Sequence, residues 1–203
     1  MEGVDPQRVA ANLAEVREEV GDGVRILAAV KYVEDITPLV EGGVTVVGEN
    51  RAQELERKHA AYPDLEWHFI GHLQSRKVKQ VLPLVKWIHS VASDSALEQL
   101  GKHGTPETEI LVEVNIAGED GKSGIGPGEL EAFVDRCPVT VVGLMTMPPA
   151  AQNPEDSRRW FAALRELAER HGLPELSMGT SQDYAVAAQE GATIVRVGTR
   201  LYR

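Results

Sequence analysis

The segment DPQRVAANLAEVREEVGDGVRILAAVK, residues 5–31, joins an amphipathic helix to an apolar strand and so sets the fold class. Asp5 is a typical N-cap residue, and Pro6 suits the first helical position. Apolar residues then recur on one helical face, at Val9, Leu13, Val16 and Val20. The apolar run RILAAV at 25–30 predicts a short buried strand directly after this helix.

The same alternation of helix and strand patterns continues to the end of the chain without a linker. Further strands are predicted near 45–48, 67–70, 87–90, 110–115, 139–145, 175–177 and 193–197. Strands separated by helices indicate a parallel sheet. Only six residues follow the last strand, so the N-terminal helix would take the place of the closing helix. We predict an α/β fold, a single (β/α)8 TIM barrel domain over residues 1–203 that begins with a helix; a doubly wound open sheet is the alternative.

The composition is that of a globular protein, with 42% hydrophobic and 26% charged residues. A net charge of −10 argues against a general nucleic-acid or membrane-surface binder. The N-terminus lacks the basic start and apolar run of a signal peptide, and no apolar stretch approaches a membrane span. We therefore expect a cytoplasmic protein.

Lys31 follows the first predicted strand directly. Because strand side chains alternate, Leu27 and Ala29 share its face. In a (β/α)8 barrel, the functional residues gather at the C-terminal ends of the strands, so we expect Lys31 to point into the barrel mouth. A partly desolvated amine is held toward its neutral form, which attacks an aldehyde to form a Schiff base. On position alone, a solvent-facing lysine just past the strand remains the alternative.

Arg196 lies inside the apolar strand TIVRV at 193–197, on the same face as Ile194. A guanidinium in such a strand needs a partner, because an unpaired buried charge is costly. The partner is either a bound ligand or an inward carboxylate, with Glu113 and Glu49 as the candidates.

Small and hydroxylated residues occupy the turns after the last two predicted strands. They are Gly179, Thr180, Ser181, Gly198 and Thr199. The loops after strands seven and eight are the recurrent phosphate site of this architecture. A Gly-Thr pair also forms ordinary turns, but its presence at both positions favours a phosphate site.

The histidines and the single cysteine carry no comparable signal. His68 and His72 are four residues apart, but in a strand and loop this spacing does not bring them together, so we predict no metal site. Cys137 fits a buried helix face and has no second cysteine with which to form an intramolecular disulfide.

The strand ends occur within motifs that resemble the pyridoxal 5′-phosphate (PLP) homeostasis family, small single-domain PLP-binding proteins related to the N-terminal barrel of bacterial alanine racemase. The resemblance covers nearly the whole chain in order. The matching segments are LAAVKY (27–32), VGENRAQEL (47–55), WHFIGHLQSRKVK (67–79), HSVASDSALEQL (89–100), VEVNIAGEDGKSGI (112–125), GLMTMPP (143–149), LSMGTSQDYAVA (176–187) and GATIVRVGT (191–199).

This resemblance implies that Lys31 forms the Schiff base with PLP and that Arg196 contacts the pyridine nitrogen. It implies further cofactor contacts from Asn50, Ser181, Gly198 and Thr199. The chain departs from the family where Val30 and Tyr32 flank the lysine in place of a Ser or Thr. It also has SMGTS at 177–181 where SMGMS is usual, and it ends in the short tail GTRLYR.

An arginine at the pyridine nitrogen favours a carrier over a catalyst. Arginine can only donate, so the nitrogen stays unprotonated and accepts electrons poorly. The related racemases also use a tyrosine from an added β-domain, for which this chain has no room. We predict a monomer that holds PLP for intracellular PLP and amino-acid homeostasis without substantial catalysis, with PLP-dependent apo-enzymes as recipients.

Two enzymes remain as alternatives. One is a PLP-dependent amino-acid racemase that uses Tyr32 or a tyrosine from another subunit. The other is a class I aldolase-like enzyme in which Lys31 attacks a sugar-phosphate carbonyl.

Overall fold

The computed structural model describes residues 4–203 and contains a closed barrel of eight parallel strands, in the order β1 to β8. Residues 1–3, the start of the segment interpreted as lacking a signal peptide, lie outside the described residues. The strands are β1 (Arg25–Ala29), β2 (Val46–Glu49), β3 (Glu66–Phe69), β4 (Trp87–Val91), β5 (Glu109–Glu113), β6 (Thr140–Met145), β7 (Glu175–Thr180) and β8 (Ile194–Val197).

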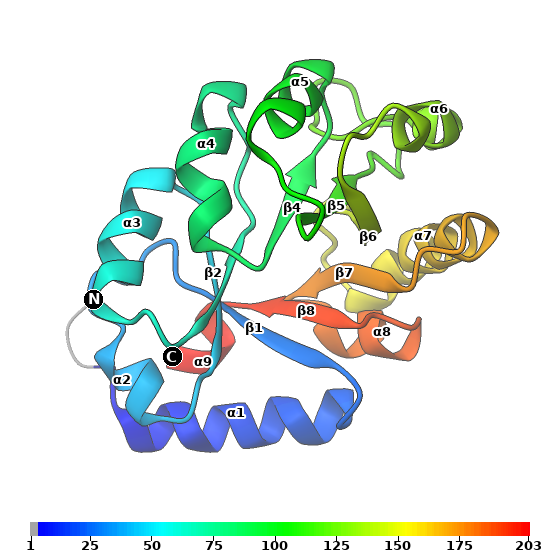
Figure 1. Cartoon of the computed structure of the whole chain (residues 1–203). Helices are drawn as coiled ribbons and strands as arrows, with labels where there is room; N and C mark the ends of the chain where they lie inside the picture. The colour runs from blue at the N-terminus through cyan, green and yellow to red at the C-terminus, as the bar shows by residue number, and fades with distance from the viewer. Residues whose placement is uncertain (1–3) are drawn as a thin grey trace.

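Helices connect the strands and surround the barrel (Figure 1). They are α1 (Pro6–Val20), α2 (Thr37–Glu41), α3 (Ala52–Ala61), α4 (Val78–Val81), α5 (Asp94–His103), α6 (Leu130–Asp135), α7 (Arg158–Arg170), α8 (Tyr184–Gln189) and α9 (Thr199–Tyr202). Short 3₁₀ turns lie at Ser75–Lys77, Leu82–Leu84, Pro127–Glu129 and Pro154–Ser157. None of the helices in residues 4–203 combines the length and apolarity needed to cross a bilayer.

Closure of the barrel joins the first strand to the last. β1 and β8 pair in parallel, with Leu27 opposite Arg196 and Ala28 opposite Val197. The predicted (β/α)8 barrel is therefore confirmed, and the open-sheet alternative is wrong. Helix α1 packs on α2, α8 and α9, outside the junction of β1 and β8 (Figure 1), which is the place that the sequence assigned to it.

Strand alternation separates two apolar clusters, as the sequence predicted. The barrel interior holds a small cluster that includes Leu27 and Ile194. The branched residues of the same strands, such as Ile26 and Val195, pack outward in the main core beneath the helices. Arg196 has the parity of Ile194, and only 5% of it is exposed.

Two predicted strand ends are corrected. β5 stops at Glu113 instead of residue 115, because Val114 already forms an isolated bridge with Ile125 in the following loop. β7 continues to Thr180, three residues beyond the prediction. Gly179 was interpreted as the start of the turn, but it lies inside the strand with φ of 89°, and a Cβ there would stand 2.5 Å from the Cβ of Ala187. This glycine thus lets α8 pack closely against β7.

Candidate functional site

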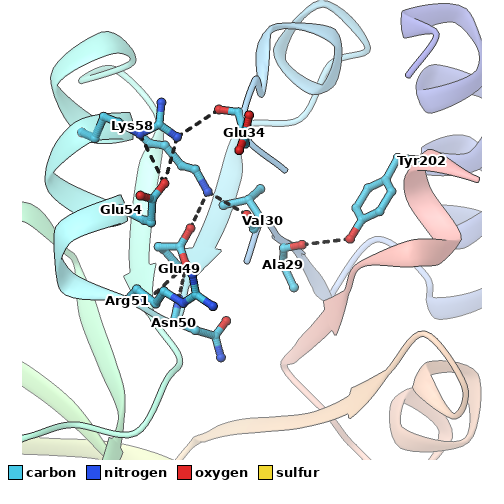
Figure 2. Close-up of polar contacts among 10 residues, drawn as sticks. Ala29, Val30, Glu34, Glu49, Asn50, Arg51, Glu54, Lys58 and Tyr202 are labelled. Atoms are coloured by element: carbon cyan, nitrogen blue, oxygen red, sulfur yellow. Dashed lines mark hydrogen bonds and ion pairs between the residues drawn. The ribbon is translucent and has the colours of Figure 1, made fainter. Parts of the chain in front are cut away.

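The ends of β1 and β8 bring two of the predicted site segments together. A Cβ placed on Gly198 would lie 3.7 Å from the Cβ of Ala29, two residues before Lys31. The hydroxyl of Tyr202 donates to the carbonyl of Ala29 at 3.5 Å, as Figure 2 shows. The C-terminal segment GTRLYR (198–203), which differs from the family pattern, therefore packs against the strand that leads to Lys31, and its Leu201 is fully buried.

Lys31 lies two residues past the end of β1 and is half-buried. Its Nζ stands 4.8 Å from the centre of the Tyr32 ring. Both side chains border a hollow of about 530 Å³ that also involves Arg51 and Lys58. Tyr32 is 67% exposed, and the neighbouring Lys31 lowers the pKa of its phenol, mainly through a hydrogen bond. Within residues 4–203, no hydrogen bond joins Lys31 to Arg196 or to the turns after β7 and β8.

The last two turns do meet. Ser181 Oγ accepts a hydrogen bond from the backbone N–H of Gly198 at 2.9 Å and a longer one from that of Arg200 at 3.5 Å. Its hydroxyl proton can still be donated to an oxygen ligand. Thr199 begins α9 and is exposed beside this contact. The structure thus brings together three of the predicted site residues, Ser181, Gly198 and Thr199.

Arg196 is held by neutral groups in the barrel interior. Its Nη1 donates to the carbonyl and the hydroxyl of Ser177, both at 2.7 Å. Its Nη2 donates to the Thr146 carbonyl at 2.9 Å and lies 2.8 Å from the sulfur of Met147. These contacts use four of the five guanidinium N–H groups. No hydrogen bond within residues 4–203 uses Nε–H, which remains free to donate to an acceptor such as a pyridine nitrogen.

The two carboxylates proposed as partners of Arg196 do not pair with it. Glu49 forms its ion pair with Lys58 instead. Glu113 makes no ion pair within 4.0 Å in the described chain, and burial raises its pKa although the positive charge of Arg196 opposes this. Burial lowers the pKa of Arg196 to about 10, with Glu113 partly opposing, so the guanidinium stays charged at neutral pH.

Asn50 begins the loop after β2, and a buried ion pair holds its backbone. Glu49 Oε1 accepts from the backbone N–H of Asn50 at 2.6 Å and from that of Arg51 at 3.2 Å. Glu49 Oε2 pairs with Lys58 Nζ at 2.5 Å, and Lys58 also donates to the Val30 carbonyl at 2.7 Å (Figure 2). Lys58 is 2% exposed and Glu49 is fully buried. One ammonium therefore ties the residue before Lys31 to the residue before Asn50.

Asn50 also borders a cavity of about 600 Å³ above β2 and β3, together with Arg51, His72, Arg76 and Lys77. Gly71 packs directly on Asn50, since a Cβ on Gly71 would stand 2.1 Å from the Asn50 carbonyl oxygen. No group of three or more His, Cys, Asp or Glu residues within the described chain could hold a metal ion.

Sequence reasoning missed Lys58 and the partners of Arg196. Lys58 occurs in the polar helical stretch ELERKH, where nothing but its position on the face of Leu55 marks it as buried. Ser177 has the inward parity of β7, so alternation along the strand could have identified it.

Comparisons with known proteins identify the family of the chain. The model of the family described as alanine racemase, N-terminal domain, matches residues 4–203. A pyridoxal phosphate homeostasis protein of Aquifex aeolicus is 41% identical, over 96% of this chain and 94% of that protein. A solved structure of PipY from Synechococcus elongatus PCC7942 with PLP bound superposes with a TM-score of 0.82 at 31% identity, covering 96% of this chain and all of PipY.

Alanine racemase from Corynebacterium glutamicum shares the fold alone, with a TM-score of 0.78 at 18% identity. The match covers 98% of this chain but 61% of the racemase. Full-length relatives at more than 30% identity and the family match together fix the family. The chain belongs to the pyridoxal phosphate homeostasis proteins, within the alanine racemase N-terminal domain family.

Proposed function

We propose that this protein holds PLP as a Schiff base on Lys31 and takes part in PLP and amino-acid homeostasis as a carrier. The observation that carries the proposal is the Nε–H of Arg196, which no hydrogen bond within residues 4–203 uses, on the strand paired with β1. Arg196 would donate to the pyridine nitrogen. Asn50, Ser181, Gly198 and Thr199 would hold the rest of the cofactor, with the phosphate at the Ser181–Gly198 contact.

The chemistry of Lys31 suits reversible loading. Its amine and the aldehyde of PLP form a C=N bond with loss of one water, and water reverses the reaction. Lys31 is half-buried beside an open hollow, so PLP and water can both reach it. When bound, PLP supplies an electron sink for reactions of amino acids, and Arg196 would weaken that sink by leaving the ring nitrogen unprotonated.

A racemase-like activity is the second candidate, because the phenol of Tyr32 lies beside the amine of Lys31. Racemisation needs acid–base groups on both faces of the substrate. Tyr32 lies on the same loop as Lys31 and is largely exposed, which supports the carrier over the racemase. Formation of D-alanine from L-alanine by the wild type, lost in Tyr32→Phe, would instead establish the racemase.

Borohydride reduction of the PLP-loaded protein, followed by peptide mapping, tests the lysine. We expect label on Lys31 and its loss in Lys31→Ala, with full labelling in the control Lys77→Ala, whose side chain borders the neighbouring cavity. Label on Lys86 or Lys122 would refute the assignment. A protein that takes up no PLP at all would favour the aldolase-like alternative.

The remaining features of this proposal are a monomeric state, a cytoplasmic location and the transfer of PLP to PLP-dependent apo-enzymes. The last feature can be tested by measuring how fast an apo-aminotransferase becomes active when the PLP-loaded protein is mixed with it and when a PLP-permeable membrane separates the two. Comparison of the two rates distinguishes direct transfer from release into solution. Faster activation in contact supports delivery, whereas equal rates support buffering alone.

A further inference from the structure

A chain of hydrogen-bonded polar side chains crosses the barrel interior and ends at Arg196. Glu66 Oε1 lies 3.0 Å from His68 Nε2, and His68 Nδ1 lies 2.7 Å from His89 Nε2. His89 Nδ1 lies 2.8 Å from Ser177 Oγ, which accepts from Arg196 at 2.7 Å. These residues come from β3, β4, β7 and β8, and all but Glu66 are buried.

With both imidazoles neutral, the Glu66 end of this chain sets the direction of every hydrogen bond. Arginine can only donate, so Ser177 Oγ accepts from Arg196 and its own hydroxyl proton stays available for donation. An ionised carboxylate can only accept, so His68 carries its proton on Nε2 and donates to Glu66. His68 Nδ1 is then an acceptor, and His89 must donate to it from Nε2. His89 Nδ1 is in turn the acceptor for the Ser177 hydroxyl, so the two neutral imidazoles are each protonated on Nε2.

The surrounding charges support this state. Burial lowers the pKa of His68 despite the opposing effect of Glu66, and burial lowers that of His89 well below its ordinary value. The positive charges that face the two rings, Arg25, Lys86 and Arg196, act in the same direction. Hydrogen bonds from His68 and Lys86 hold the pKa of Glu66 near 2, so its carboxylate is ionised at neutral pH.

We propose that Glu66, His68, His89 and Ser177 are positioning residues for Arg196, which fix the orientation of its guanidinium and transmit the polarisation of the Glu66 carboxylate to it. Arg196 is a buried cation without an ion pair within 4.0 Å in residues 4–203, and such a charge needs compensation. Successive hydrogen bonds polarise one another, so this series of hydrogen bonds supplies part of the compensation for the charge of Arg196. Because the Ser177 hydroxyl donates its hydrogen bond to His89 Nδ1, a lone pair of Ser177 Oγ stays directed at Nη1 of Arg196.

The consequence for cofactor binding rests on the proposed function. With Nη1 and Nη2 fixed by Ser177 and Thr146, the direction of the free Nε–H is fixed as well. Its donor geometry is then set before a ligand arrives, and preorganised donors bind more tightly.

The tautomers can be measured without cofactor. In protein labelled with ¹⁵N at histidine, two-bond ¹⁵N–¹H spectra distinguish the Nε2–H tautomer from the Nδ1–H tautomer and from the imidazolium, and His68→Gln and His89→Gln assign the signals. We expect both residues as neutral Nε2–H tautomers at neutral pH. An Nδ1–H tautomer or an imidazolium at either position would overturn the proposal.

The coupling to Arg196 is tested by Ser177→Ala, with Ser157→Ala as the matched control. Ser157 is another fully buried serine, but its hydroxyl has no hydrogen-bond partner in the described residues. In Ser177→Ala we expect a shifted Arg196 Nε–H resonance and about tenfold weaker PLP binding, the scale of one hydrogen bond to a charged group. The control should change neither, and Glu66→Gln should shift the resonance less than Ser177→Ala does.

The outcomes separate this inference from the proposed function. If PLP loads on Lys31 while Ser177→Ala changes neither the resonance nor the affinity, the positioning role is wrong. If the tautomers and the resonance behave as expected but PLP does not label Lys31, the positioning role stands and the proposed function fails.

Discussion

Replacing Lys58 by methionine should destabilise the protein severely, because Lys58 is buried and forms an ion pair with the buried Glu49. The change keeps the approximate volume of the side chain but leaves the Glu49 carboxylate buried without its ion partner, at a site where the two side chains are 2% and 0% exposed. Breaking a buried pair in this way costs about 3–5 kcal/mol. Two backbone N–H groups still donate to Glu49, which favours the lower part of that range.

The assay is urea unfolding followed by tryptophan fluorescence, together with thermal melting. For a chain of 203 residues, each kcal/mol corresponds to about 2–4 °C, so we expect a fall in Tm of roughly 6–20 °C. The matched control is Lys77→Met, because Lys77 is half-buried and its ammonium bonds only the Gln80 side chain within residues 4–203, so its loss should cost about 0.5 kcal/mol or less.

A second variant isolates the charge. Adding Glu49→Gln to Lys58→Met removes the unpaired charge and keeps an oxygen that accepts from the Asn50 and Arg51 N–H groups, so much of the lost stability should return. The reasoning is refuted if Lys58→Met costs less than about 1 kcal/mol, or if the double variant is no more stable than the single one.

Three further predictions concern other parts of the barrel. Gly71→Ala should destabilise the protein by about 2 kcal/mol or more and weaken PLP binding, since the new Cβ would stand 2.1 Å from the Asn50 carbonyl oxygen. The control is Gly128→Ala, where a Cβ has no atom within 4 Å, so its unfolding free energy in urea should change by less than about 0.5 kcal/mol. The pKa of Glu66 is lowered to about 2, chiefly by the hydrogen bond from His68, so its stabilising effect is complete above its ordinary pKa of 4.5 and disappears as the pH falls through about 2. Glu66→Gln should therefore lose less unfolding free energy than the wild type between pH 5 and pH 2, and parallel curves would contradict this. Burial raises the pKa of the Cys137 thiol, so an aromatic disulfide reagent at about pH 8 should react more slowly with the folded protein than with the urea-unfolded chain, and equal rates would count against it.

Strand alternation predicted which side chains of β1 and β8 enter the barrel, because a parallel strand covered by helices has only two faces. Leu27 and Ile194 do lie inside and Ile26 and Val195 outside. The sequence predicted that α1 would take the place of the last helix, and the packing of α1 on α2, α8 and α9 beside the β1–β8 junction confirms it. Both predictions depend on local periodicity and chain length, which the sequence contains directly.

The partners of Arg196 could not be predicted in the same way. Alternation assigns Glu113, Ser177 and Arg196 to the interior, but it does not give their height along the barrel axis, which depends on the stagger between strands. In the β7–β8 pairing, Ser177 lies opposite Ile194 and Arg196 opposite Thr180, with a register shift between them, yet the guanidinium reaches the carbonyl and hydroxyl of Ser177. A carboxylate was the natural expectation for a buried arginine, yet carbonyl and hydroxyl oxygens hold it.

Two arrangements of buried polar and charged side chains link the strands of the barrel, and each has a cost in stability that bears on its role. The Lys58–Glu49 pair ties β1 to the β2 loop, and the chain that ends at Arg196 links β3, β4, β7 and β8. An apolar filling of the same volume is often at least as stabilising as a buried ion pair, so stability alone does not account for either arrangement. What such groups add over an apolar core is direction, since a hydrogen bond fixes orientation and a methyl contact does not. Each arrangement ends on backbone or side chains next to Lys31, Asn50 or the free Nε–H of Arg196. We therefore infer that the barrel spends stability on the orientation of these three groups, as the proposed PLP site requires.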